Sequence, residues 1–412
     1  MNAARHSSPP PILSLALLAG VFVMEGFDIN AMALAVPRLG GDLGFAPAAF
    51  GWVFTALLVG IGIGGALLAP LGDRFGRRAL IVTGCAVVAV ATMGTSTATS
   101  ITQFLLWRLL TGISLGAVLP NCTALSSELA PPRLRATVMA VVSAGIPLGL
   151  AAAGIAAPAI VAAAGWHGLF IVPGLFAALL ALAHRLVLAG GLPAGAGDKP
   201  EAGTKLPQMA LFTAPWAFPF AVFAVLLALN ALNLYLLNSW LPTVLPGAGL
   251  SLDDAARVAG IVQLAGLAIG LLASLLMDRW RPGATLLLMF AAITACFTTI
   301  ALTAPDATRW VLLLSVAVGG ASAGGMVLPS LCAYLFPARM LSSAVGMGVL
   351  VARLGAFAGP PLGGAMLAAK VAPQTFLGVA AIPALVCTLL CLAIPAALAV
   401  KNRVEAPEPD QA

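Results

Sequence analysis

The 412 residues are 61% hydrophobic and only 8% charged, and the mean hydropathy is +1.06. A soluble domain carries about 25% charged residues, so this composition excludes a soluble globular protein and indicates an integral membrane protein. The net charge of +6 does not indicate a nucleic-acid surface, because the lysines and arginines are spread over short loops.

Twelve apolar runs follow one another along the chain, each able to cross a hydrocarbon core of roughly 30 Å as a helix. Their approximate bounds are 12–36, 48–70, 79–97, 101–124, 135–162, 166–189, 216–241, 254–276, 284–303, 310–333, 341–368 and 374–399. A more polar stretch separates the sixth run from the seventh. The sequence therefore predicts an all-α membrane protein with an N-terminal six-helix bundle (1–189), a cytoplasmic linker (190–214) and a C-terminal six-helix bundle (215–412).

The first run carries two carboxylates in the middle of its apolar residues, Glu25 and Asp28. Three residues apart on a helix, they share one face. An ionised side chain at this depth costs roughly 2.5–3.5 kcal/mol on insertion scales, and two neighbouring acids disfavour joint ionisation. Carrying a proton relieves that cost, so we predict that Asp28, with Glu25, is the site of proton coupling.

The loop between the second and third runs, residues 69–78, reads APLGDRFGRR. It resembles the loop signature of the major facilitator superfamily, with an alanine in place of the first glycine. A carboxylate in such a loop can dock on the N-terminus of a neighbouring helix and stabilise one conformation. The resemblance implies a gating role for Asp73, Arg74, Gly76 and Arg77. The alternative is that the arginines only set the topology.

Two arginines also lie inside apolar runs, Arg108 in the fourth and Arg353 in the eleventh. Charges within a membrane usually face a cavity or a transport pathway, and a guanidinium can hold a carboxylate with two parallel hydrogen bonds. We therefore predict that both arginines contact an anionic substrate, and that Arg108 also pairs with the acids of the first run. The alternative is that the four charges form structural ion pairs only.

The two halves of the chain repeat. Asp73 and Asp278 lie 205 residues apart, each followed by an arginine, and Pro120 and Pro329 lie 209 residues apart. Two parallel six-helix repeats, with the substrate site near the membrane midplane between them, are a recurrent transporter architecture. By this correspondence Asp278 and Arg279 are predicted to act in gating as the first loop does.

The loops alternate in charge along the chain. Counted in order, fourteen lysines and arginines fall on one side and four on the other. The basic side is predicted to be cytoplasmic, which places both termini and the linker in the cytoplasm. We expect no cleavable signal peptide, since the first run lacks a small-residue cleavage site.

The seventh run holds amides in place of charges, Asn230, Asn233 and Asn238, with Trp240 on the same broad face. Amides and an indole suit an aromatic ring that bears a carboxylate or a hydroxyl, so Asn233, Asn238 and Trp240 are candidate substrate contacts. Hydrogen bonds between helices are the alternative. Asn121, next to a proline in the fourth run, either lines the same cavity or holds a helix kink.

Glycines and prolines gather in the fifth run, in Gly145-Ile146-Pro147-Leu148-Gly149, and in the eleventh, between 355 and 364. Glycine permits close helix contact and proline loosens the backbone ladder, so both segments predict tight packing between helices that flex or slide. The fifth run lacks the adjacent glycine-proline pair of an antiporter motif, which argues against an exporter.

Further motifs resemble one family within the superfamily, the aromatic acid:proton symporter family. They are EGFD at 25–28 where that family has DGFD, RLLTG at 108–112, ELAPPRLR at 128–135, NSWLPT at 238–243 and RLG at 353–355. The similarity to permeases for 4-hydroxybenzoate, protocatechuate and benzoate covers nearly the whole chain. The resemblance adds Phe27 to the candidate substrate contacts and Glu128 and Arg135 to the candidate gating residues.

The resemblance implies a symporter that imports an aromatic or related carboxylate with protons across the bacterial cytoplasmic membrane, by alternating access. It implies no cofactor besides the proton gradient, no metal, no nucleic-acid partner, and a monomer in the lipid bilayer. The alternative is proton-coupled efflux antiport of drugs or metabolites. A receptor or an enzyme is disfavoured, because the sequence holds no evident nucleophile–base pair, metal-ligand cluster or sensor domain. The six cysteines lie in apolar runs and indicate core packing.

Overall fold

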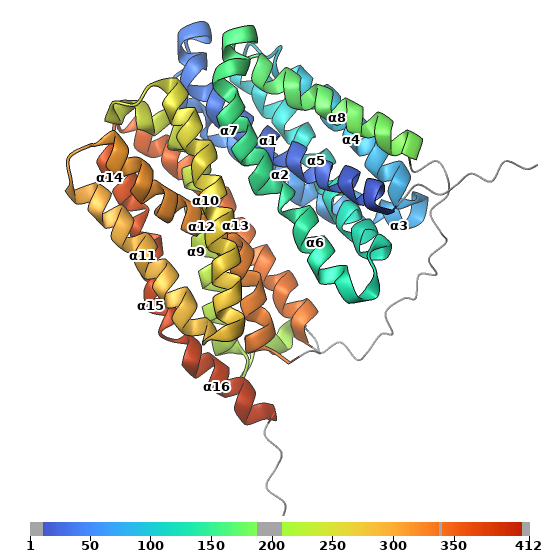
Figure 1. The fold of residues 1–412 in the computed structure, drawn as a ribbon, viewed down its shortest axis with the longest axis vertical. Helices are drawn as coiled ribbons and strands as arrows, with labels where there is room; N and C mark the ends of the chain where they lie inside the picture. The colour runs from blue at the N-terminus through green and yellow to red at the C-terminus, as the bar shows by residue number, and fades with distance from the viewer. Residues whose placement is uncertain (1–10, 188–207, 338–339, 406–412) are drawn as a thin grey trace, which may run out of the picture. The chain divides into compact units, whose positions relative to one another are not determined.

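The computed structural model describes residues 11–187, 208–337 and 340–405, and every regular element within these ranges is a helix. Twelve segments of the described chain are long and apolar enough to cross a membrane. The predicted all-α architecture with twelve membrane-crossing segments is therefore confirmed (Figure 1). Most of the predicted linker, residues 190–207, lies outside the described residues, and its last part begins with a 3-10 turn at Gln208–Phe212.

Eight spans each consist of one helix. These are α1 (Pro11–Leu43), α4 (Arg77–Thr95), α5 (Ile101–Leu129), α8 (Gly168–Val187), α10 (Leu252–Arg279), α11 (Pro282–Leu302), α12 (Ala307–Leu335) and α13 (Leu341–Ala368). The other four spans combine shorter pieces. They contain α2 (Gly51–Ile63) with a π-helical turn at Gly64–Leu68, α6 (Arg135–Ser143) with α7 (Gly145–Ala164), α9 (Ala217–Val244) with a 3-10 turn at Leu245–Ala248, and α14 (Pro373–Val379), α15 (Ala381–Cys391) and α16 (Ile394–Glu405). A short helix, α3 (Leu71–Phe75), lies between α2 and α4.

Prolines explain where the fifth and twelfth spans are divided. Pro147, Pro383 and Pro395 each lie in the first turn of a new helix, α7, α15 and α16 respectively. Proline has no N–H to donate and its fixed φ suits a helix start, so the backbone begins a new helix there. Both predicted spans are present, and each is divided into shorter helices within the membrane-crossing segment.

The first helix is longer than the apolar run that predicted it. The run ends at residue 36, but α1 continues to Leu43. In this extension Arg38 donates to the Leu34 carbonyl at 2.9 Å and pairs with Asp253 at 3.0 Å. Hydropathy marks where the apolar residues stop, whereas a helix continues as long as its polar end finds partners.

By its contacts the chain divides into two compact units. The first comprises 1–197, 238–264 and 360–370, and the second comprises 198–237, 265–359 and 371–412. This division passes through α9, α10 and α13, so each unit is described by itself. The predicted bundles 1–189 and 215–412 stay a prediction.

Within the first unit, helices approach closely wherever glycines face each other. Gly60 and Gly64 meet α5, where a methyl group on Gly64 would collide with the Ile113 carbonyl. Gly149 of α7 meets α1 in the same way, at the Val23 carbonyl. These contacts agree with the predicted packing role of the glycine-rich segment in the fifth run.

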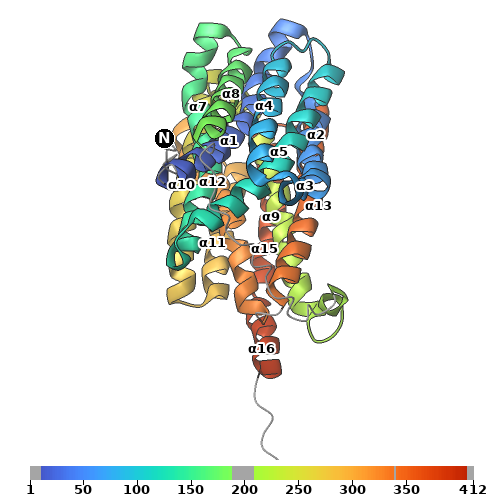
Figure 2. The same cartoon turned by 90° about the vertical axis from the view of Figure 1, so that its right-hand side faces the viewer.

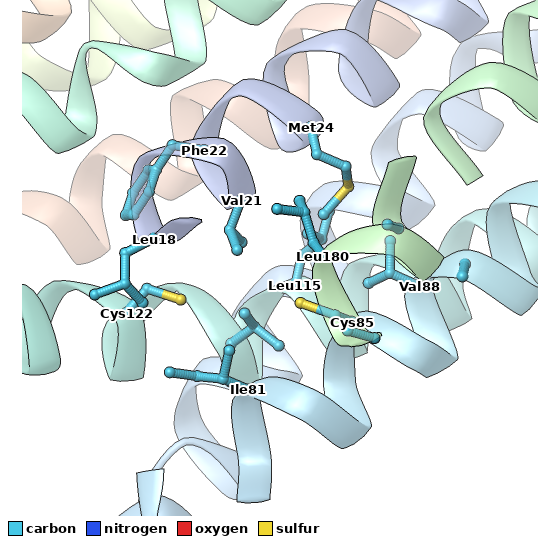
Figure 3. Close-up of a cluster of buried hydrophobic side chains, with 14 of the residues drawn as sticks. Leu18, Val21, Phe22, Met24, Ile81, Cys85, Val88, Leu115, Cys122 and Leu180 are labelled. Carbon is cyan, nitrogen blue, oxygen red and sulfur yellow. The ribbon is translucent and has the colours of Figure 1, made fainter. Parts of the chain in front are cut away.

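The core of the first unit is a cluster of buried apolar side chains (Figure 3). α1 contributes Leu18, Val21 and Met24, and α4, α5 and α8 supply most of the remainder. Cys85 and Cys122 belong to this cluster and all six cysteines are free, as the sequence predicted for core residues. The last fully buried α1 member, Met24, lies about one turn before Asp28, and the half-buried Ile29 beside Asp28 also packs against the cluster.

The second unit also has helices that pack closely at a glycine. A methyl group on Gly355 of α13 would collide with the Ala228 carbonyl of α9, so these helices are also in backbone contact. Asn230 of α9 donates to the Ala321 carbonyl of α12 at 3.1 Å. α11 packs against α12 and α15, and α16 continues beyond α15 (Figure 2).

Candidate functional site

A buried ion pair joins α1 to α5. Arg108 Nη1 donates to Asp28 Oδ2 at 2.8 Å, and Arg108 Nη2 donates to the Asp28 backbone carbonyl at 3.1 Å. Asp28 is 0% exposed and Arg108 is 1% exposed. The predicted partnership between the first-run acids and Arg108 is thus present in the structure, with Asp28 as the carboxylate that touches the guanidinium.

A third helix completes the surroundings of Asp28. Thr92 of α4, also fully buried, donates its hydroxyl to Asp28 Oδ1 at 3.1 Å. Each carboxylate oxygen therefore accepts a hydrogen bond, one from a cation and one from a neutral hydroxyl. Such a pair is tolerated in a membrane interior because the two charges compensate each other.

Glycine packing fixes the position of this stretch of α1. A methyl group on Gly26 would collide with the Ile146 carbonyl of α7, so the two backbones touch directly beside the acids. Asn30, one turn further on, donates to the Leu150 carbonyl at 2.8 Å. The two contacts hold α1 against α7 on one side while Asp28 reaches α5 on the other.

The remaining predicted residues of α1 lie close by in sequence. Glu25 is 4% exposed, one turn before Asp28, and it makes further interactions within the described chain. Phe27 is half-buried. Their roles in proton coupling and substrate contact stay predictions.

Asn121 of α5 is held by the loop before α4. Its Nδ2 donates to the Ala69 carbonyl at 3.0 Å and to the Ala117 carbonyl at 2.8 Å, and its Oδ1 packs directly on Gly72. The amide therefore ties α5 to this loop and bonds its own helix one turn back, beside Pro120. Both predicted roles, the helix kink and the substrate cavity, stay predictions.

The polar residues of the seventh run make bonds between helices. Asn233 donates to the Ala380 carbonyl at 2.9 Å, and Asn238 accepts from Gln263 at 3.0 Å. Trp240 is fully buried and donates to the Pro360 carbonyl at 2.8 Å, while its ring meets Phe54 edge to face at 5.2 Å. These contacts match the alternative interpretation, in which the polar residues form hydrogen bonds between helices. Substrate contact stays a prediction.

Arg353 behaves differently from Arg108. It lies in α13, is half-buried, and forms no ion pair with any residue that the structure describes. Its contact with an anionic substrate stays a prediction.

The loop after α2 forms a charged cluster with the end of α5. Arg77 bonds both Asp73, at 3.2 Å, and Glu128. Gly76 precedes Arg77 with φ +91°, a conformation that side chains other than glycine rarely adopt. Arg74 instead lies exposed over the Phe75 ring, 5.3 Å from its centroid. The structure therefore brings together three of the predicted gating residues, Asp73, Arg77 and Glu128.

The corresponding loop of the second half is built with a neutral partner. Asp278 accepts a hydrogen bond from the Tyr334 hydroxyl at 2.9 Å. Tyr334 lies 206 residues after Glu128, which is the spacing of the repeat. Arg279 is exposed, and the Arg135 side chain lies outside the described residues.

Comparison with known proteins identifies the fold and the class. The family model of the Major Facilitator Superfamily matches residues 18–335, which is most of the chain. The chain belongs to the major facilitator superfamily. The 3-(3-hydroxy-phenyl)propionate transporter of Escherichia coli is 31% identical over 88% of this chain and 88% of its own length.

A second relative agrees with the first. The 4-hydroxybenzoate transporter PcaK of Acinetobacter baylyi is 28% identical over 93% of this chain and 91% of its own length. These matches support the aromatic acid:proton symporter family that the motifs predicted. Family and relatives are transporters, so this multi-pass membrane protein is a transporter and not an enzyme.

Solved structures agree on the fold. A bacterial homologue of the human lysosomal transporter Spinster, in an inward-facing and unoccupied conformation, superposes with a TM-score of 0.74. The alignment covers 99% of this chain and 100% of the other at 17% identity, which establishes the shared facilitator fold and nothing finer.

Two residues of these sites, Thr92 and Tyr334, were not predicted from the sequence. Thr92 is one of several hydroxyl residues near the end of the third run, with Thr95, Ser96 and Thr97, so nothing in the sequence singled it out as the partner of Asp28. Tyr334 could have been found by applying the repeat spacing to Glu128, because it lies 206 residues later and the two repeated pairs lie 205 and 209 residues apart.

Arg108 has N–H groups that its bonds to Asp28 do not use. Its Nε is buried and donates to no described residue, and its two bonds to Asp28 use only part of its five N–H groups.

Proposed function

We propose that this facilitator imports an aromatic carboxylate together with a proton, and that Asp28 and Arg108 form the coupling centre. The observation that carries the proposal is the fully buried ion pair between them. The printed substrates of the relatives, a hydroxyphenyl propionate and a hydroxybenzoate, are aromatic carboxylates and support the substrate class.

Charge balance supplies the mechanism. Without substrate, the Asp28 carboxylate neutralises Arg108. A substrate carboxylate that binds Arg108 leaves Asp28 without its cation, and a buried charge that loses its partner costs about 3–5 kcal/mol. Protonation of Asp28 removes that cost, because the site then holds one cation and one anion again. Binding of the acid therefore favours uptake of one proton.

The remaining residues take supporting roles in this proposal. Thr92 orients the carboxylate of Asp28, and Glu25 is a second protonatable group on the same helix face. Arg353 is our candidate for a second contact to the substrate, since its guanidinium pairs with no described residue. The positive-inside count supports cytoplasmic termini.

Liposomes with the purified protein and an internal pH-sensitive dye test the function. Addition of radiolabelled 3-(3-hydroxyphenyl)propionate should acidify the interior by one proton per molecule taken up, beyond the passive entry seen in protein-free liposomes. Protein-dependent uptake without acidification would contradict symport. Proton-driven loss of preloaded acid would instead support efflux.

A further inference from the structure

Two apolar grooves flank the first turns of α11 within the second unit. One, of about 300 Å³, lies between α10, α11 and α12, and Leu272, Trp280 and Leu288 are among its lining residues. The other, of about 450 Å³, lies between α11 and the α15–α16 segment, and Arg281 and Leu392 are among its lining residues. We name them the α10 groove and the α16 groove.

The α10 groove fits one leaflet of a bilayer. It follows α10 from Ile269 to Trp280, about 16 Å at 1.5 Å per residue, and half of a hydrocarbon core is about 15 Å. Leu272 and Leu288 are 58% and 61% exposed along it. Trp280, 65% exposed, lies at the end where an indole prefers the headgroup level. The groove therefore suits an acyl chain whose headgroup lies beside Trp280.

Two cations stand at that same end. Arg279 and Arg281 are exposed and form no ion pair or side-chain hydrogen bond with any residue that the structure describes. The neighbouring acid, Asp278, is engaged by Tyr334. This end lies on the side that the loop charges predict to be cytoplasmic, where basic pockets between helices hold anionic lipid headgroups.

The positions of the grooves indicate what kind of lipid joins them. At 100° per residue, Thr285, Leu288 and Ala292 of the α10 groove lie on the face of α11 opposite Gly283 and Leu287 of the α16 groove. A helix about 10 Å wide separates the two faces. The two chains of a single phosphatidyl unit share one glycerol and cannot straddle that width, whereas two linked phosphatidyl units can.

We propose that the cytoplasmic end of α11 binds one diphosphatidylglycerol (cardiolipin) molecule. One phosphatidyl unit places a chain in the α10 groove and the other places a chain in the α16 groove. The two phosphates lie at Arg279 and Arg281, one for each guanidinium.

Native mass spectrometry of the delipidated protein tests this site independently of transport. The full-length protein is mixed with equimolar cardiolipin, phosphatidylglycerol and phosphatidylcholine, and the fraction that retains each lipid is measured. Wild type should retain one cardiolipin in preference to the other two. Arg281→Gln should weaken that retention about fivefold, as expected for one arginine near an anionic surface.

Matched variants keep the result interpretable. Arg403→Gln, an exposed arginine of α16 that lines neither groove, should retain cardiolipin like wild type. Ala292→Phe fills the α10 groove and should reduce retention, whereas Ala295→Phe, exposed on the same helix outside the groove, should not. Equal retention of phosphatidylglycerol, or Arg281→Gln behaving like Arg403→Gln, would overturn the proposal.

Discussion

At the scale of single residues, Asp28 shows how an acid is accommodated inside a membrane. Its oxygens accept from Arg108 and Thr92, and none of the three side chains is more than 1% exposed. Because water is excluded, each hydrogen bond to Asp28 stabilises the folded protein more than the same bond would at a surface. Loss of either partner should therefore lower the stability measurably. Two predictions separate the contributions of these partners.

The first prediction concerns the charge pair. Asp28→Asn should lower the free energy of unfolding by about 3–5 kcal/mol, because Arg108 is left as a buried charge without its partner. Adding Arg108→Gln should restore most of that loss, since the double variant buries no charge. Thermal melting in detergent measures both. A double variant less stable than Asp28→Asn would show that the pair is not the source of the cost.

The second prediction concerns the hydroxyl. Thr92→Val keeps the shape of the side chain but removes its hydrogen bond to Asp28, so it should cost about 1.5–3 kcal/mol in the same melting measurement. Thr95→Val is the control, because among the described residues the buried Thr95 hydroxyl bonds only the Ala91 carbonyl of its own helix. Equal losses of stability in the two variants would show that the Thr92 hydroxyl makes no special contribution through Asp28.

Buried charges could be assigned a partner from the sequence, whereas buried amides could not. The depth of Asp28 and Arg108 in apolar runs was enough to predict that they are partners, because buried charges must be compensated. The amides of α9 could not be assigned in this way, since an amide is satisfied equally by a substrate or by a carbonyl such as that of Ala321 or Ala380. Hydropathy carries no information about which of these a helix face meets.

At the scale of elements, glycines decide how near two helices come. α1 touches α7 through Gly26 and Gly149, and α13 touches α9 through Gly355. The glycine-rich segments were visible in the sequence, but their partners were not, because small residues mark a contact without naming the helix on its other side. The helix breaks near Pro147 and Pro383 were not predicted either, because the hydropathy of an apolar run does not change where one helix ends and the next begins.

A prediction follows for the α1–α7 contact. Gly26→Ala should destabilise the protein by about 1–3 kcal/mol and lower transport, because the methyl group displaces α7 beside Asp28. Gly41→Ala on the same helix has open space around it and should be neutral or stabilising by about 0.4–1 kcal/mol. Melting curves and uptake rates compare the two. Equal behaviour would mean that α1 is not held by this contact.

At the scale of the whole molecule, the loop clusters of the two halves lie at corresponding positions in the sequence but bond their aspartates to different partners. The first loop cluster has an arginine shared by two carboxylates, whereas the second has a tyrosine bonded to one carboxylate. The twelve spans and the family were predictable, since hydropathy and motifs report them directly.

The loop cluster leads to a kinetic prediction. Asp73→Asn should slow transport by about two- to fivefold, because an exposed ion pair contributes at most about 1 kcal/mol, and should change substrate affinity no more than that. Asp42→Asn, an exposed carboxylate at the end of α1, serves as the control. Complete loss of binding by folded Asp73→Asn protein would instead place Asp73 at the substrate site.

The most direct test of proton coupling at Asp28 compares two transport modes of Asp28→Asn in liposomes. Exchange of labelled for unlabelled aromatic acid at equal pH needs no net proton movement, so the variant should retain it. Accumulation driven by a pH gradient needs the proton, so the variant should fall to the level of protein-free liposomes, while Asp42→Asn accumulates like wild type. Wild-type accumulation by Asp28→Asn would contradict the coupling role of this residue.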